Sequence, residues 1–186
     1  MTRSMPGLHP IANMIIRSET PDDEDAIHSV TLAAFAQASR TGGNEAQIVR
    51  ELREHGDLTI SLVAQDDREI VGHIAFSPVR IGGRHNGWFG LGPVAVRPSL
   101  QGCGIGSELV RRGLALLKAQ NARGCVLLGK PEFYKRFGFQ SNGTIAFDGL
   151  PTRLVQHLVF AGEIPAGELN YARAFDLAKS PSRPNS

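Results

Sequence analysis

The sequence is poor in several features that mark particular classes of protein. It has only two cysteines, Cys103 and Cys125, in 186 residues, too few for a disulfide framework or a cysteine-ligated metal site. The formal net charge is +2 and no basic run of useful length occurs, which argues against a nucleic-acid-binding surface. No apolar run approaches the ~20 residues needed to cross a membrane, and prolines and polar residues interrupt the apolar stretch that a secretory signal needs. We therefore expect a cytoplasmic protein with no metal, nucleic-acid or membrane partner.

The residues that are present suit a single globular domain. Hydrophobic residues make up 41% of the chain and charged residues 20%, which is enough to bury a sizeable core. Residues 1–13 and 177–186 show no hydrophobic periodicity, and we interpret them as an N-terminal tail and a polar C-terminal tail. We expect the domain to span residues 14–176.

Hydrophobic periodicity and turn residues divide this domain into strands and helices. We expect strands beginning at Met14 and spanning 59–65, 70–81, 88–96 and 125–128, and helices beginning at Thr20 and spanning 44–56 and about 104–121. Short turns join the three middle strands, which predicts an antiparallel meander. The strand, helix and strand that follow predict a parallel pair. The expected fold class is α/β (α+β) with a mixed central sheet.

The stretch between the strand that ends at Val96 and the next helix is rich in glycine. Gly102, Gly104 and Gly106 occupy alternate positions directly before the helical pattern begins. The free N–H groups and the dipole at a helix start attract anions, and glycines let a phosphate approach the backbone closely. The spacing fits neither the P-loop nor the dinucleotide-binding pattern. Taken alone, these residues are compatible with a phosphate site or with a plain strand-to-helix turn.

Two motifs, in the same order and with the same separation, resemble those of a known family. The first is similar to the acyl-CoA loop of the GNAT superfamily of N-acetyltransferases, Val-x-Pro-x-x-Gln-x-x-Gly-x-Gly, formed here by Val96, Pro98, Gln101, Gly104 and Gly106. The second, Phe-Tyr-Lys-Arg-Phe-Gly-Phe at 133–139, resembles the Tyr-x-x-x-Gly-Phe signature of that superfamily. Likeness to a bacterial subgroup at 149–151, 167–171 and 174–175 extends the resemblance over about residues 14–176.

The resemblance implies both a fold and a cosubstrate. The implied fold is GNAT-like, with helices on both faces of the mixed sheet and a parallel pair whose strands splay apart around 94–96 and 126–128. Acyl-CoA would fill that gap like an added strand. The implied cosubstrate is acetyl-CoA, which an amine attacks directly. The residues expected to bind it are Val94, Ala95, Val96, Gln101, Gly102, Cys103, Gly104, Ile105, Gly106 and Ser107.

Two residues are expected to shape the chemistry of this site. A proline inside a central strand removes a ladder donor, so Gly92-Pro93 predicts a bulge where the strands part, the alternative being an ordinary kink. An N–H freed near Val94 would bind the acetyl carbonyl and the oxyanion that follows. Tyr134 matches the general acid of the family, which protonates the departing thiolate of CoA. The alternative is an aromatic residue that only packs beside Phe133.

The general base is not identified by the sequence. Many relatives place an acid on the fourth strand, but residues 88–96 contain no Asp or Glu. Glu45, His73 and Ser77 are candidates for lining the amine pocket, and each has a structural alternative, as a helix-start residue or a hydrogen-bonded strand residue. Lys130 stands where relatives in the subgroup often carry Asp, which reverses a charge near the expected site.

The expected function is acetyl transfer from acetyl-CoA to a primary amine of a small molecule. The alternatives are transfer to a protein or peptide amine, and a CoA-binding regulatory module without catalysis. Cys103, at a helix start, is either a reactive thiol or a small loop residue, and Cys125 is expected to be inert core. The expected partners are acetyl-CoA and the amine, with a homodimer left open.

Overall fold

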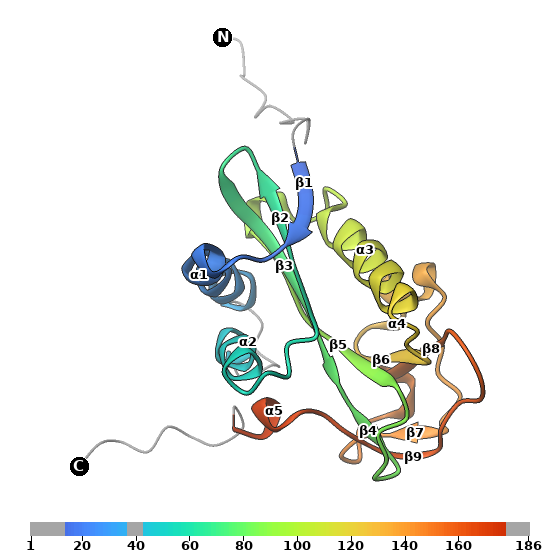
Figure 1. Cartoon of the computed structure of the whole chain (residues 1–186). Coiled ribbons are helices and arrows are strands. Elements are labelled where there is room, and N and C mark those ends of the chain that lie inside the picture. Colours follow the sequence, from blue (N-terminus) through green and yellow to red (C-terminus); the bar gives the residue numbers. More distant parts are fainter. Residues whose placement is uncertain (1–13, 37–42, 178–186) are drawn as a thin grey trace.

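The computed structural model describes residues 14–36 and 43–177, so the two expected tails lie outside the described residues apart from residue 177. Two sheets form the framework (Figure 1). The larger has the order β1-β2-β3-β5-β6-β8, and the smaller has the order β4-β9-β7. The strands are β1 (Met14–Ser18), β2 (Ile60–Asp66), β3 (Glu69–Pro78), β4 (Arg80–Ile81), β5 (Trp88–Val96), β6 (Gly124–Leu128), β7 (Ile145–Ala146), β8 (Val155–Val159) and β9 (Gly167–Asn170).

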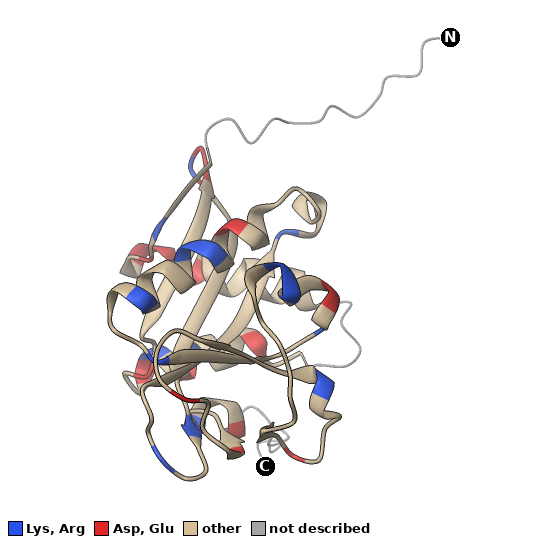
Figure 2. Cartoon of the chain, turned by 90° about the vertical axis from the view of Figure 1, so that its right-hand side faces the viewer, with Lys and Arg blue, Asp and Glu red and all other residues tan. Residues whose placement is uncertain are grey.

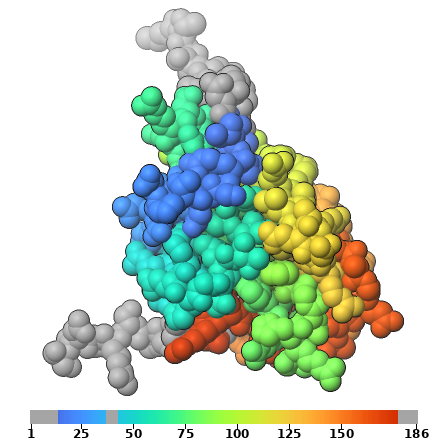
Figure 3. Space-filling view, viewed as in Figure 1, coloured from blue at the N-terminus to red at the C-terminus, as the bar shows by residue number. Residues whose placement is uncertain are grey.

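Helices cover both faces of the larger sheet (Figure 1). On one side lie α1 (Glu24–Phe35) and α2 (Glu45–Glu54), and on the other lie α3 (Ile105–Ala119) and α4 (Pro131–Tyr134). The last helix, α5 (Arg173–Leu177), packs against α2, directly below it in the space-filling view (Figure 3). The predicted mixed sheet with helices on both faces is therefore confirmed. Within the described residues, no helix is long and apolar enough to cross a membrane.

Local sequence signals account for where the first helices begin. The backbone N–H of Thr20 donates to Asp23 Oδ2 at 2.7 Å, and Pro21 opens a single 3₁₀ turn that leads into α1. Pro suits this position because the first N–H groups of a helix have no intrahelical partner. The second helix starts directly after Asn44 and ends at Glu54, two residues before Gly56, whose φ is +73°. Both helix starts were predicted.

The strand pairing agrees with the predicted topology except at one point. Strands β2, β3 and β5 form the antiparallel meander, and β5 and β6 form the parallel pair. The single strand expected at 70–81 is wrong, because β3 ends at Pro78 and residues 80–81 form β4 in the smaller sheet. Val79, directly after Pro78, still donates its N–H to Trp88 on β5. Beyond it, Ile81 turns away, pairs with Leu169 and is only 2% exposed.

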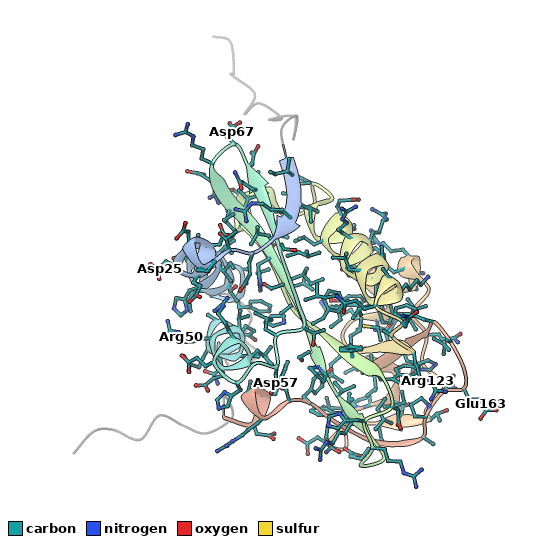
Figure 4. All side chains as sticks on the ribbon, in the orientation of Figure 1. Asp25, Arg50, Asp57, Asp67, Arg123 and Glu163 are labelled. Carbon is teal, nitrogen blue, oxygen red and sulfur yellow. The ribbon has the colours of Figure 1, made fainter. Side chains whose placement is uncertain are left out.

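Helix α3 packs closely against the larger sheet. A Cβ atom on Gly113 would lie 2.2 Å from Cε2 of Phe76, so only glycine lets the helix approach this ring. A separate apolar cluster that includes Ile27 and Val49 lies under α1 and α2. The outer sides of these two helices carry polar residues such as Asp25 and Arg50, which point away from the sheet (Figure 4). Core and solvent faces thus follow the helical period.

Candidate active site

The parallel strands β5 and β6 are paired along only part of their length. Trp88, Phe89 and Gly90 pair with residues 124–126, and no further pairs follow between these strands. On its other edge, β5 remains paired with β3 up to Val96. The strands therefore part after Gly90 and leave one edge of β5 open over residues 91–96. This is the predicted splay.

A bulge lies where the two strands separate. Ile74 of β3 pairs with Val94 and Phe76 pairs with Leu91, so one residue of β3 faces two residues of β5, Gly92 and Pro93. The predicted irregularity at Gly92-Pro93 is thus present. Arg97 donates its N–H to Val71 on β3, and backbone groups alternate in direction along a strand. The N–H groups of Val96 and Val94 therefore point into the splay.

The glycine-rich loop stands at the open end of this splay. Residues 101–104 are exposed, and Gly102 and Gly104 have φ values of +80° and +90°. A Cβ atom at either position would meet nothing within 4 Å, so the space in front of the backbone is open. Gln101 Nε2 donates to the carbonyl oxygen of Val96 at 3.1 Å and ties the loop to the end of β5.

Buried residues anchor the helix that follows the loop. Ile105 is 1% exposed and Ser107 is 9% exposed, whereas Cys103 is an exposed free thiol. Val94 and Val96 pack toward the α3 side of the sheet. Ala95 is buried with its side chain on the opposite side, as strand alternation requires. The residues expected to bind the cosubstrate thus surround the splay, except Ala95, whose side chain and N–H both face away from it.

Tyr134, at the end of α4, lies against the strand that forms the other wall of the splay. A Cβ atom on Gly129 would be 2.5 Å from Cε2 of Tyr134, so the ring packs directly on the backbone after β6. Phe133 meets the ring edge-on with centroids 4.8 Å apart. Burial, and to a lesser degree the nearby Cys125, raise the pKa of Tyr134 to about 12. Its hydroxyl is therefore protonated at neutral pH and available as a donor.

The three candidates for the amine pocket lie between the larger sheet and the helices α1, α2 and α5, on the side of the sheet opposite α3 and Tyr134. His73 and Ser77 project from β3 toward α1, α2 and α5, as does Ala75 between them. Glu45 opens α2 in the same layer. All three are buried, and Glu45 Oε2, His73 Nδ1 and Ser77 Oγ have no hydrogen-bond partner among the described residues. Buried polar atoms without partners are costly, which marks these positions as unusual.

A buried polar network, which the sequence analysis missed, surrounds His73. Nε2 of His73 lies 2.7 Å from Ser61 Oγ, and the Ser61 hydroxyl donates to Glu19. Arg53 binds both carboxylate oxygens of Glu19, at 2.9 and 3.1 Å. Burial alone would raise the pKa of Glu19, but the nearby His73, whose Nε2 lies 3.7 Å from Glu19 Oε2, and hydrogen bonds from Arg53 and Ser61 outweigh burial and lower the pKa to about 2. Glu19 is therefore ionised at neutral pH.

This network determines which nitrogen of His73 carries the proton. Burial is the main cause that lowers the pKa of His73, so its ring is neutral at pH 7. Ser61 has one hydroxyl proton, which goes to Glu19, so Ser61 Oγ must accept the contact at 2.7 Å from His73 Nε2–H. The remaining nitrogen, Nδ1, is then the unprotonated one, and it is the atom without a partner. No sequence signal links these residues, because they come from separate segments.

The charges on the α3 side and one pocket near Trp88 lie outside this site. The α3 side shows Lys and Arg intermixed with Asp and Glu (Figure 2). A pocket of about 380 Å³ next to Arg123 and Glu163 (Figure 4) lies at Trp88, the paired end of the β5–β6 pair and away from the splay. Among residues 14–36 and 43–177, no group of three or more His, Cys, Asp or Glu side chains is placed to hold a metal ion.

A mixed sheet whose parallel strands part beside a glycine-rich helix start defines the architecture of acyl-CoA-dependent N-acyltransferases. Comparisons with known proteins narrow this class to a family. The family model described as an acetyltransferase (GNAT) domain matches residues 57–141. The uncharacterized N-acetyltransferase YhbS of Escherichia coli K12 is 39% identical over 128 residues, which are 68% of this chain and 74% of that protein. The chain belongs to the GNAT family of N-acetyltransferases.

Two solved structures of family members match most of the chain. A GNAT family acetyltransferase from Brucella melitensis, solved in complex with acetyl-CoA, is 47% identical with a TM-score of 0.80, over 88% of this chain and 98% of that one. The YhbS protein of Escherichia coli, solved in complex with CoA, is 32% identical with a TM-score of 0.80, over 88% and 92% of the two chains. The predicted family and fold are thus confirmed.

Proposed function

We propose that this chain transfers an acetyl group from acetyl-CoA directly to a primary amine of a small molecule. The observation that carries the proposal is the open edge of β5 beside an exposed glycine-rich helix start. Acyl-CoA presents a diphosphate, which suits a helix start, and an extended arm, which suits an unpaired strand edge. The two relatives solved with acetyl-CoA and with CoA support this assignment.

The geometry suggests how the cosubstrate binds. The backbone N–H groups from Gly102 to Ser107 would hold the diphosphate, and the pantetheine arm would lie along the N–H groups of Val94 and Val96. The N–H at Val94, next to the bulge, would then bind the acetyl oxygen. One such donor is worth about 2.7–4 kcal/mol in the barrier of an acyl transfer.

Bond making and breaking can be assigned around Tyr134. The amine nitrogen would attack the carbonyl carbon, the C–S bond would break, and the sulfur would take the proton of the Tyr134 hydroxyl. The nitrogen loses one proton as it becomes an amide, and this proton would restore the Tyr134 hydroxyl. A phenol with a pKa of about 12 is a weak acid, but the same burial also makes the thiolate more basic. We therefore expect Tyr134 to speed the reaction mainly through its hydrogen bond to the departing sulfur.

The amine would approach through the layer that holds Glu45, His73 and Ser77. A substrate ammonium must lose a proton before it attacks, and the unprotonated Nδ1 of His73 is a buried acceptor. The buried state of these groups favours a small amine over a peptide, which needs an open groove. We place the reaction in the cytoplasm, because both cysteines are free thiols, which is typical of a reducing compartment.

Turnover assays test the proposal. Acetyl-CoA is supplied with a panel of small primary amines and with peptides that have free N-termini or lysines, and free CoA is measured. We expect turnover on a small amine, and at least about a tenfold lower kcat for Tyr134→Phe, with unchanged CoA binding by calorimetry. Turnover on peptides alone would replace the small-amine proposal with a peptide acetyltransferase. Tight CoA binding without turnover on any amine would indicate a regulatory module.

A further inference from the structure

Glu45, the first residue of α2, carries a buried carboxylate without a counter-ion. The residue is 7% exposed, and its Oε2 atom has no hydrogen-bond partner. Among residues 14–36 and 43–177, no Lys, Arg or His side chain forms an ion pair with it. The dipole at the start of α2 partly offsets the cost of burying this charge, but Oε2 still lacks a hydrogen-bond donor. The structure therefore holds a buried acceptor that the described residues leave unused.

The carboxylate points into the layer between α2 and the larger sheet. Glu45, Ile48 and Leu52 occupy positions i, i+3 and i+7 of the helix and so share one side of it. Ile48 and Leu52 pack in one cluster with Ala75 of β3. This side of α2 therefore faces β3, and Glu45 extends it by one turn toward the helix start.

Helix α2 runs from the β5 side of the sheet back toward the β1 edge. Near its end, Arg53 forms an ion pair at 3.7 Å with Glu24, the first residue of α1. Arg17 of β1 binds Asp23, one residue earlier, at 2.6 Å. Helix α1 thus starts beside β1 and crosses the sheet to contact both β3 and β5. Because α1 and α2 pack together with the end of one beside the start of the other, Glu45 lies on the β5 side.

The same layer borders the bulge of β5, where space is open. A Cβ atom on Gly92 would meet nothing within 4 Å. Ser77, whose Oγ also has no partner, pairs with Gly90, and a Cβ atom on Gly90 would be 2.6 Å from Cε1 of Tyr171. Paired residues share one side of a sheet, so the Tyr171 ring lies on the Ser77 side. It stacks on Phe175 with centroids 4.5 Å apart, and the two rings form an aromatic wall.

The charge of Glu45 suits a group that stays positive during the reaction. The attacking amine must lose its proton, and a carboxylate beside it would favour the protonated ammonium instead. His73, whose Nδ1 has no partner, is better suited to that nitrogen. Glu19 does not offer a second free charge, because Arg53 already binds both of its oxygens.

We propose that the substrate carries a second cationic centre besides the amine that is acetylated, and that the carboxylate of Glu45 binds this centre. This proposal rests on the proposed function and names the class of its substrate. Because Oε2 lacks a donor, the second centre has N–H groups, as an ammonium or a guanidinium does. The apolar chain between the two nitrogens would lie along the wall formed by Tyr171 and Phe175. The acetyl group goes to one end, and the other end keeps its charge.

Pairs of substrates of equal length test this role. Each α,ω-diamine, and its ω-guanidino analogue, is compared with the alkylamine in which a methyl group replaces the second cationic group. We expect kcat/KM for at least one dication to exceed that for its partner by about 10- to 150-fold, the factor that one hydrogen bond to a charged group supplies.

Variants of α2 assign this preference to one side chain. Glu45→Gln keeps the shape and removes the charge, so the ratio of the two kcat/KM values should fall to near one. Glu45→Asp keeps the charge and should retain a preference for dications. The matched control is Glu54→Gln, which removes an exposed charge from the same helix and should leave the ratio as in wild type.

Binding measurements separate this proposal from the proposed function. Calorimetric titration of the CoA complex with the preferred dication gives a Kd that needs no turnover. This Kd should rise about 10- to 150-fold in Glu45→Gln and stay the same in Glu54→Gln. A CoA complex that binds dications no more tightly than alkylamines, or a preference that survives in Glu45→Gln, overturns the role of Glu45 even if the enzyme is active.

The kinetic comparison has a second way to contradict the role of Glu45. An equal loss of kcat/KM on both kinds of substrate in Glu45→Gln would place this carboxylate at the reacting nitrogen and overturn the proposal. Binding of the dication that depends on Glu45, without turnover of any amine, would instead overturn the proposed function alone.

Discussion

The substitution Gly106→Ala should separate cosubstrate binding from stability. Gly106 lies in the first turn of α3, and its φ is not in the left-handed region. A Cβ atom there would lie 3.6 Å from Cγ2 of Val96 and 4.0 Å from Cζ of Phe133, both ordinary contacts. Alanine is favoured over glycine in helices by up to about 1 kcal/mol. The variant should therefore be as stable as wild type or have a Tm up to about 2–4 °C higher.

The same methyl group should weaken CoA binding. It would stand between Val96, at the end of β5, and Phe133, on the far side of the splay, where the cosubstrate enters. Losing one charge-assisted hydrogen bond to the diphosphate costs about 1.5–3 kcal/mol. At about 1.4 kcal/mol for each factor of ten, the Kd for CoA should rise by roughly 10- to 150-fold.

Calorimetric titration with CoA and thermal unfolding, run on the same samples, test this reasoning. The matched control is Gly113→Ala in the same helix, where the new Cβ atom would lie 2.2 Å from Phe76. Overpacking of this kind costs about 1–3 kcal/mol, so the control should lose stability while CoA binds normally to the folded fraction. If Gly106→Ala bound CoA as tightly as wild type, the diphosphate would not lie at the start of α3 and the site would have to be redrawn.

Three further predictions concern the loop, the buried network and the cysteines. Gly104→Ala, at a φ of +90° with no atom near the new Cβ, should cost about 1–2 kcal/mol of stability from backbone strain alone, measurable by urea unfolding. The pKa of Glu19 is lowered from 4.5 to about 2 in the folded protein. The ionised Glu19 therefore stabilises the fold by at most about 3 kcal/mol above pH 4.5, and this contribution is lost as the pH falls toward 2. The lowered pKa of His73 keeps its ring neutral in the folded protein. Protonation of this residue in the unfolded state should therefore lower the stability further as the pH falls below 6.5. Unfolding curves from pH 7 to 3 should therefore show less acid sensitivity in Glu19→Gln, and equal curves would contradict the network. A thiol reagent should modify the exposed Cys103 but not Cys125, because burial raises the pKa of the Cys125 thiol. Added CoA should slow the modification of Cys103. If the rate of modification stayed the same with CoA present, the cosubstrate would not lie at the loop.

Much of the fold could be predicted because its signals are local. The bounds of β5 follow from a turn before Trp88 and from Pro98 after Val96, and both matched the structure. The bulge follows from Pro93, which cannot donate to a ladder. The glycines of the loop and the helical period after them mark the start of α3. The break of the strand expected at 70–81 was missed, because the apolar run from 79 to 81 looks the same whether it continues one sheet or enters another.

The sequence by itself determined the glycine loop and the bulge, because each depends on the conformations that a few neighbouring residues allow. The fold family and the parted strands were predicted from the resemblance of two sequence motifs to a known family. Only the tertiary structure decided which side chains meet. Glu19, Ser61 and His73 form one network although 42 residues separate the first two, and the ring of Tyr171, which follows β9, packs directly on Gly90 of β5. Such contacts depend on the packing of distant segments, and backbone propensity does not encode which polar atoms that packing buries together.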